Sequence, residues 1–235
     1  MRLRHFEDAV FLLLCAGESG EASRGTGFAV GDGSVVVTAA HVVRGHQNCV
    51  VLRGTPTGDH WGSKGRVTFL EDEADVGIVR LEKQSPGVLQ LKDRSPTEMD
   101  HLLVWDWPAW QEGSKPLLER DAQPRALAAL YTSTWTTRRG ARRFGFAART
   151  GHGMSGGPIV NAETGDVLGL VIGSWQVDEH EVVEKWWDNI GDRYEVREDA
   201  EIDPSHLLES MKAHLALGLG IGVPADCIGS ALRQQ

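Results

Sequence analysis

The sequence is poor in cysteine, in long apolar runs and in positive charge, and each shortage excludes a class of protein. Three cysteines in 235 residues, Cys15, Cys49 and Cys227, are too few and odd in number for a disulfide framework. We expect reduced thiols in a reducing compartment. No apolar run approaches the roughly 20 residues of a membrane-spanning helix. The formal net charge is −9, and an acidic charge spread evenly over the surface would argue against a nucleic-acid partner, because phosphates are neutralised by Lys and Arg.

What is present is an ordinary globular composition, with 41% hydrophobic residues, and a length that fits one large or two small compact units. The N-terminus imitates a signal peptide, since the basic residues of 1–4 precede an apolar run at 9–16. Glu7 and Asp8 interrupt that pattern, and a buried first strand explains the run better. We therefore predict a cytoplasmic protein, with a secreted or periplasmic location as the alternative.

Short segments rich in Val, Ile, Leu and Phe, separated by Gly, Asp, Ser and Pro, predict strands along most of the chain. The first set is Val10–Cys15, Gly27–Val30, Ser34–Thr38, Val50–Leu52, Arg66–Phe69 and Val76–Leu81. The second set is His101–Trp105, Ala126–Trp135, Arg143–Ala148, Pro158–Asn161 and Val167–Ser174. Strands at this spacing favour barrels or a sandwich over βαβ units.

Three further segments are not predicted as strands. Residues 18–25 are interpreted as a polar turn and residues 83–99 as a linker. Residues 207–217 have helical spacing, and 223–233 fit a last short helix. Residues 176–203 contain 11 acids against three bases, so nearly all of the net charge belongs to this stretch.

Three blocks carry residue types that perform nucleophilic catalysis when a fold brings them together. His41 follows Gly25–Val30 in the first block, Asp75 lies in the second (74–81), and Ser155 lies in the third (151–158). The three residues are 34 and 80 positions apart, in the order His, Asp, Ser. A serine hydroxyl is a poor nucleophile at neutral pH and needs an adjacent base, which an imidazole supplies.

In these blocks the sequence resembles the trypsin/chymotrypsin-like serine peptidases, in particular the bacterial branch with HtrA-type and glutamyl-endopeptidase-type enzymes. The resemblance spans about residues 8–217 and is sharp only in the three blocks. It implies two antiparallel six-stranded Greek-key β-barrels with a cleft between them, and a C-terminal helix. The predicted units are a first barrel (1–95), a second barrel (96–203) with 176–203 as an acidic insertion, and a helix with tail (204–235).

The resemblance also implies a serine endopeptidase that needs no cofactor and acts on protein or peptide substrates. Ser155 attacks the scissile carbonyl, and His41 takes the serine proton and returns it to the leaving amine. Asp75 holds the imidazole tautomer and stabilises the imidazolium. The backbone N–H groups of Gly153 and Ser155 form the oxyanion hole, where one donor typically contributes about 3–4 kcal/mol.

The residues beside Ser155 depart from the animal enzymes in one respect. Position 154 is Met, where the digestive enzymes carry the Asp that pairs with a new N-terminus after zymogen cleavage. We therefore do not expect activation through that salt bridge. Gly156 and Gly157 are expected to leave room for the substrate backbone.

Substrate choice is predicted from family position alone. By this position, Arg149 helps to form the base of the S1 pocket, with Thr150 beside it, and its positive charge would make the pocket select Glu or Asp. The alternative is that Arg149 is a loop residue that points outwards. Ile172, Gly173 and Ser174 match the strand that pairs with the substrate backbone.

Three other features have structural explanations beside functional ones. The tryptophans of segment 105–110 are interpreted as packing rather than ligand stacking. Segment 138–143, with four arginines, is a solvated turn, a contact for an acidic partner or a processing site. The acidic insertion is a solvated loop, a gate for substrates or a site for a regulatory protein.

No metal site is predicted, since zinc-ligand spacing is absent around His41, His46 and Cys49.

Two alternatives to an active serine endopeptidase stay open. The sequence Gly153–Gly157 also satisfies the nucleophile elbow of α/β-hydrolases, although Pro158 and a predicted strand follow it directly. The other alternative is a non-catalytic or partner-activated regulatory or binding module on the peptidase fold. Because a cytoplasmic peptidase needs restraint, we also expect control by a regulatory protein partner, a limited set of substrates or a distorted resting site. We expect neither a nucleic-acid partner nor binding to a membrane.

Overall fold

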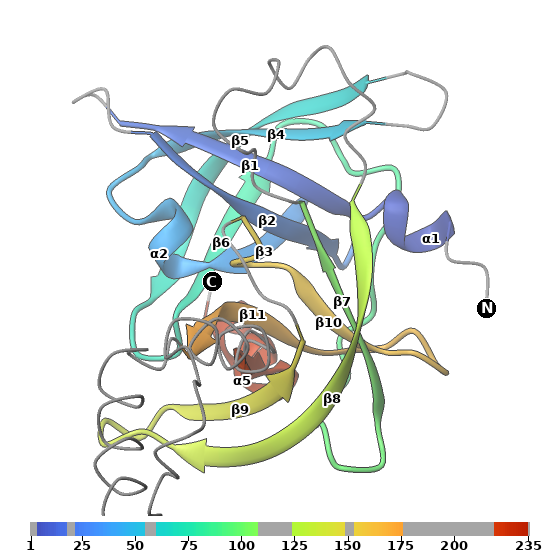
Figure 1. Cartoon of the computed structure of the whole chain (residues 1–235). Helices are drawn as coiled ribbons and strands as arrows, with labels where there is room; N and C mark the ends of the chain where they lie inside the picture. The colour runs from blue at the N-terminus through green and yellow to red at the C-terminus, as the bar shows by residue number, and fades with distance from the viewer. Residues whose placement is uncertain are drawn as a thin grey trace, which may run out of the picture.

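Two closed antiparallel barrels of six strands each make up the protein (Figure 1). The computed structural model describes residues 4–17, 22–54, 60–107, 124–148, 153–175 and 219–234. The strand order is β1-β2-β3-β6-β5-β4 in the first barrel and β10-β11-β12-β9-β8-β7 in the second. The predicted fold class, a double barrel with a C-terminal helix, is confirmed.

The first barrel consists of β1 (Val10–Ala16), β2 (Ala22–Val30), β3 (Val35–Ala39), β4 (Asn48–Gly54), β5 (His60–Glu71) and β6 (Val76–Leu81). The second consists of β7 (His101–Asp106), β8 (Arg125–Thr136), β9 (Arg142–Ala147), β10 (Pro158–Asn161), β11 (Val167–Trp175) and β12 (Leu219–Pro224). The helices in the described part of the chain are α1 (Arg4–Glu7), α2 (Ala40–Val43) and α5 (Ala225–Leu232). Within the described ranges, none of them has the length and apolar character that crossing a membrane requires.

All eleven predicted strands overlap an observed one, and the misses have physical reasons. The predicted turn at 18–25 is too long, because the β1–β2 ladder continues to the pair Ala16↔Ala22. The glycine-rich strand β12 lacks the β-branched run that identifies a strand, and Val223 was assigned to the last helix instead. Since β12 closes the second barrel, that barrel extends past the predicted boundary at residue 203. The predicted helix at 207–217 and the acidic insertion lie outside the described residues.

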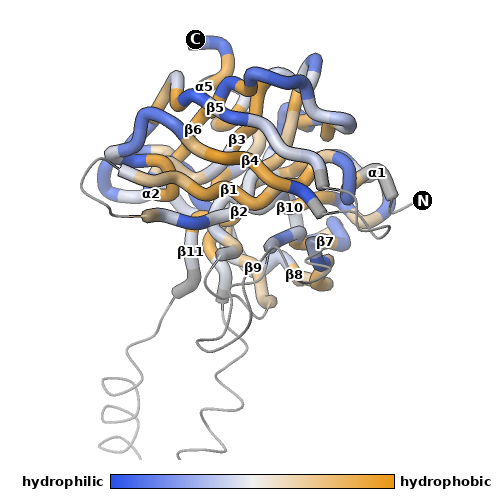
Figure 2. The backbone as a smooth tube through the Cα atoms, turned by 90° about the horizontal axis from the view of Figure 1, so that it is seen from above, coloured by the Kyte–Doolittle hydropathy of each residue, from blue (hydrophilic) through white to orange (hydrophobic). Residues whose placement is uncertain are grey.

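The two barrels share one hydrophobic core cluster. Trp105 and Trp107 are both buried in it, which confirms a packing role for these tryptophans. The Trp107 indole N–H donates to the Val10 carbonyl across 3.3 Å. In Figure 2 the hydrophobic colour runs along β1, the strand on which this indole rests. Burial of these large side chains between the barrels fixes how the barrel with His41 and Asp75 is placed relative to the barrel with Ser155.

The structure corrects the prediction of reduced thiols, because Cys15 and Cys49 form a disulfide. The two residues are direct partners in the β1–β4 ladder, with Cα atoms 4.1 Å apart. Their separation of 34 residues gives no hint of this register, and so the odd count was misleading. Cys227 remains a free thiol. The cysteines therefore no longer support a reducing compartment.

Asp100 ties the chain between the barrels to the second barrel. Its carboxylate accepts two hydrogen bonds from the Arg94 guanidinium (2.6 and 2.7 Å), one from the Thr97 backbone N–H (2.9 Å) and one from the Asn161 amide (2.8 Å). The Arg94 guanidinium contributes most to holding the pKa of Asp100 far below its usual range, and Thr97 and Asn161 add to the effect. The ionised carboxylate is thus favoured by the fold.

Replacing Asp100 by Asn is expected to lower the free energy of unfolding by about 2–3 kcal/mol at neutral pH, since several charge-assisted hydrogen bonds are lost. Because the folded pKa is depressed, the stabilisation exists above the unfolded pKa of about 3.9 and disappears as the pH falls towards the folded pKa. Denaturant unfolding from pH 7 to pH 2.5 measures this. The gap between the variant and the wild type should shrink on acidification, and the exposed Asp93→Asn variant should show no comparable gap.

Candidate active site

His41 is presented at the protein surface by the one-turn helix α2. Ala40, Val42 and Val43 are buried and anchor the turn against the first barrel, whereas the side chain of His41 is 39% exposed. A helical turn directs its residues to different faces, so three apolar anchors leave the imidazole facing outwards. The backbone of His41 is therefore held in place, while its imidazole ring is accessible from solvent.

Asp75 ends the turn between β5 and β6 and orients that imidazole. Its Oδ2 lies 2.7 Å from His41 Nδ1, and its Oδ1 accepts the His41 backbone N–H at 2.9 Å. Its own carbonyl accepts the Ala40 N–H at 3.1 Å. A carboxylate accepts but does not donate, and therefore Nδ1 carries the proton and Nε2 is left as the basic nitrogen. Among the described non-glycine residues, Asp75 alone has a positive φ, +57°.

Ser155 belongs to the second barrel, but its turn is held by strand β2 of the first. The Thr26 N–H donates to the Ser155 carbonyl (2.8 Å), and the Thr26 hydroxyl donates to the Gly153 carbonyl (2.6 Å). The Gly156 N–H donates to the Val171 carbonyl (2.6 Å). The turn is therefore fixed on both sides by backbone contacts.

Gly25 brings the serine turn and the histidine helix together. A β-carbon at Gly25 would lie 2.9 Å from the Ser155 carbonyl oxygen and 2.6 and 2.7 Å from the methyl groups of Val42. Val42 is the neighbour of His41, so the two segments pack on the same point of β2. The segments that carry His41 and Ser155 thus both pack against Gly25 of β2, and Asp75 is hydrogen-bonded to His41.

The comparisons with known proteins agree with this geometry. The sequence profile described as "Trypsin-like peptidase domain" matches residues 25–170, a range that includes His41, Asp75 and Ser155. The chain belongs to the trypsin-like peptidase family. No curated protein matches the chain in sequence.

Solved structures of bacterial proteases share the fold of this trypsin-like peptidase. The active form of the Rv3671c protease from M. tuberculosis has 18% identity and a TM-score of 0.65, over 98% of this chain and 82% of that one. The MamO protease domain from Magnetospirillum magneticum has 16% identity and a TM-score of 0.60, over 96% of each chain. The HtrA-type protease AlgW with a tripeptide has 18% identity and a TM-score of 0.56, over 72% of this chain and 52% of that one.

The structure gives the glycines after Ser155 a different reason from the expected one. A β-carbon at Gly156, whose φ is +88°, would lie 2.0 Å from the Thr26 carbonyl oxygen and 2.2 Å from the Thr38 hydroxyl. One at Gly157 would lie 2.2 Å from the Trp105 carbonyl oxygen. The space is taken by the peptidase fold itself, not left for a substrate. The roles of these glycines and of Gly25 depend on tertiary contacts that no local sequence pattern displays.

The two N–H groups that are predicted to form an oxyanion hole, those of Gly153 and Ser155, lie in the described part of the structure. Gly153 has a φ of +92°, as the predicted inward turn requires. Within the described ranges, neither the Gly153 N–H nor the Ser155 N–H donates to another protein group. N–H groups without an acceptor among the described residues are the kind of donor that a developing oxyanion needs.

The predicted substrate-binding residues are described only in part. Arg149 and Thr150 lie outside the described residues. Ile172, Gly173 and Ser174 are in β11, and a β-carbon at Gly173 would meet nothing within 4 Å. In the described ladder, the β10–β11 pairing ends at Leu170, whereas β12 pairs with β11 as far as Trp175. Val171 of the same edge bonds to Gly156 and Gly157. Beyond Val171, no described residue pairs with this edge of β11, as strand addition by a substrate requires.

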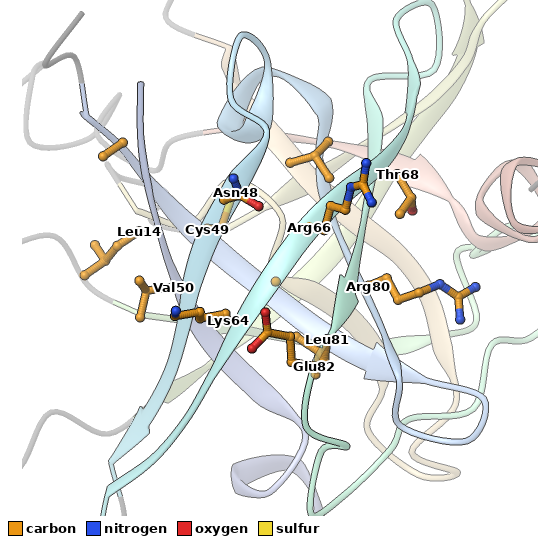
Figure 3. Close-up of a pocket in the computed structure, with 13 residues that line it drawn as sticks. Leu14, Asn48, Cys49, Val50, Lys64, Arg66, Thr68, Arg80, Leu81 and Glu82 are labelled. Atoms are coloured by element: carbon orange, nitrogen blue, oxygen red, sulfur yellow. The ribbon is translucent and has the colours of Figure 1, made fainter. Parts of the chain in front are cut away.

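A groove of about 930 Å³ lies elsewhere, on strands β1, β4, β5 and β6 of the first barrel. Figure 3 shows Lys64, Arg66, Arg80 and Glu82 along it. Arg66 and Arg80 are direct partners in the β5–β6 ladder, where like charges are unfavourable. None of His41, Asp75 and Ser155 lines the groove, so it is separate from the candidate active site. Among the described residues, no group of three or more His, Cys, Asp or Glu side chains could hold a metal ion.

Proposed function

We propose that this trypsin-like peptidase is a serine endopeptidase that works through an acyl-enzyme. The observation that carries the proposal is the His41–Asp75 pair, whose 2.7 Å contact leaves Nε2 as the base at the boundary where the serine turn lies. Family membership adds support for a peptidase. The geometry favours the three residues as one catalytic unit over a binding module that keeps them by accident.

In the proposed reaction, His41 Nε2 accepts the Ser155 hydroxyl proton while the serine oxygen bonds to the scissile carbonyl carbon. The N–H groups of Gly153 and Ser155 bind the oxyanion that forms. His41 then gives its proton to the departing amine, which leaves the acyl group on Ser155. A water molecule, deprotonated by His41, hydrolyses this ester and frees the serine. Asp75 stays ionised and holds the imidazole throughout.

Peptide turnover tests the proposed function. Wild-type protein and the Ser155→Ala and His41→Ala variants are incubated with a proteome-derived peptide library, and new termini are identified by mass spectrometry. We expect cleavage by the wild type and a loss of at least about 10⁴-fold in both variants, because the residues act as a unit. Cleavage that survives in both variants would place the chemistry elsewhere. A wild type without turnover would favour the regulatory or partner-activated module.

The same library tests the predicted preference for acidic residues on the amino side of the cut. If Arg149 forms the base of the S1 pocket, its guanidinium pairs with a Glu or Asp side chain. Arg149→Ala should then lower kcat/KM for Glu substrates by about tenfold or more, with little change for Leu substrates. Equal cleavage after Ala, Leu and Glu in the wild type, unchanged in the variant, would contradict it. The cytoplasmic location and the regulatory partner stay proposals.

A further inference from the structure

Two adjacent arginines on β9 have opposite environments. Arg142 is exposed and forms an ion pair with Asp226 of α5, with Nη1 2.6 Å from Oδ2. Arg143 is only 8% exposed. Successive side chains of a strand point to opposite faces, so the second arginine is directed inwards. Charged side chains are seldom buried without a partner, so the burial of this guanidinium does not fit a solvated hairpin tip.

The hydrogen bonds of Arg143 reach from the second barrel into the first. Nη1 donates to the Arg142 carbonyl (3.0 Å), and Nη2 donates to the Glu73 carbonyl (2.5 Å). Glu73 lies two residues before Asp75 in the β5–β6 turn. In Figure 1 this turn faces the β8–β9 hairpin across the boundary between the barrels. The described residues include no carboxylate in a salt bridge with Arg143.

The charge of Arg143 also interacts with Asp75, the carboxylate that binds His41. Burial lowers the pKa of the Arg143 guanidinium, and attraction to the Asp75 carboxylate acts in the opposite direction. By reciprocity, the same attraction favours the position of Asp75 close to the guanidinium. The backbone of Asp75, with φ +57°, is in a region that non-glycine residues adopt only when their surroundings enforce it.

We propose that Arg143 is a positioning residue, which holds the β5–β6 turn from the opposite barrel so that Asp75 keeps its hydrogen bond to His41. The proposal rests on the proposed peptidase function. It makes the alignment of the first-barrel pair depend on correct docking of the second barrel, which carries Ser155. Arg143 touches neither the substrate nor the reacting atoms.

A guanidinium suits this position better than an ammonium. Its planar fork serves the two carbonyls with separate nitrogens, whereas Lys provides the charge without that fixed geometry. Methionine fills similar space and provides neither. Arg143→Lys therefore removes the fixed geometry and keeps the charge, whereas Arg143→Met removes both. Arg142→Met is the matched control, because it removes the neighbouring charge from the same strand.

The test combines steady-state kinetics with proton NMR of the imidazole Nδ1–H, whose downfield resonance is assigned by its absence in His41→Ala. We expect Arg143→Met to lower kcat at least about tenfold with KM within twofold, and to broaden or remove the resonance. Arg143→Lys should have a kcat between those of Arg143→Met and the wild type, and part of the resonance intensity should return. Arg142→Met should keep kcat within twofold and retain the resonance, although its melting temperature falls.

Several outcomes would overturn the proposal. They are a kcat in Arg143→Met within twofold of the wild type, an equal loss in Arg142→Met, or an intact Nδ1–H resonance in Arg143→Met. If Arg143→Met does not fold, Arg143→Lys decides alone, through a reduced kcat at an unchanged melting temperature. If the wild type hydrolyses no peptide, the proposed function fails, while the resonance still shows whether Arg143 holds Asp75 on His41.

Discussion

Asp75→Asn is expected to lower kcat by about 10⁴-fold with little change in KM. The two hydrogen bonds of the carboxylate make the reason specific. Oδ1 of the new side chain can still accept the His41 backbone N–H, and its amide nitrogen then faces Nδ1. An amide nitrogen only donates, so Nδ1 must become the acceptor and the ring proton moves to Nε2. In this neutral tautomer Nε2 already carries a proton, so it cannot accept the proton of Ser155.

The control for this variant lies in the same turn. Asp72 is exposed, and its one ion-pair partner among the described residues is Arg44. Asp72→Asn therefore changes the charge equally without touching the imidazole. We expect Asp72→Asn to keep kcat within about twofold. Kinetics with one good peptide substrate give both numbers. A kcat for Asp75→Asn within tenfold of the wild type would mean that the carboxylate does not set the tautomer.

The second large effect is expected on stability, from Gly156→Ala. The new methyl group would overlap the Thr26 carbonyl oxygen and the Thr38 hydroxyl, at a backbone φ of +88°. Overpacking and the unfavourable φ together cost about 3–5 kcal/mol. For a chain of this size, that lowers the melting temperature by about 10 °C. Because the turn must move away from β2, the peptidase activity should fall as well.

Gly140 separates the two causes, since its φ is +91° and a β-carbon there would meet nothing within 4 Å. Gly140→Ala therefore has the conformational cost alone, about 1–2 kcal/mol. Thermal unfolding of both variants measures the difference, which is the cost of the overlap. Equal losses in the two variants would show that the serine turn is not packed against β2 as described.

The sequence predicts the candidate catalytic residues and most strands because both leave local patterns. His41, Asp75 and Ser155 each lie in a block of small and apolar residues with a recognisable order. Alternating or continuous apolar runs indicate strands such as Val76–Leu81, whose bounds are those predicted. Patterns of this kind depend only on neighbours in sequence.

The features that were missed depend on register and on contacts between the barrels. The Cys15–Cys49 disulfide follows from the β1–β4 register, which cysteine spacing does not encode. β12 is a strand because β9 and β11 flank it, although its residues have weak strand propensity. Arg143 looks like part of a solvated basic hairpin, and only the opposite barrel reveals that it is buried. The sequence identifies the candidate catalytic residues, but it does not identify the contacts that position them.

Covalent labelling with a fluorophosphonate tests the central claim most directly, because the reagent reacts with a serine only when a base and an oxyanion hole activate it. The account predicts one adduct per chain by intact mass, located on Ser155 by peptide mapping. The adduct should be absent in Ser155→Ala and should form far more slowly in His41→Ala. A wild type that stays unlabelled, or a label on another residue, would contradict an activated Ser155.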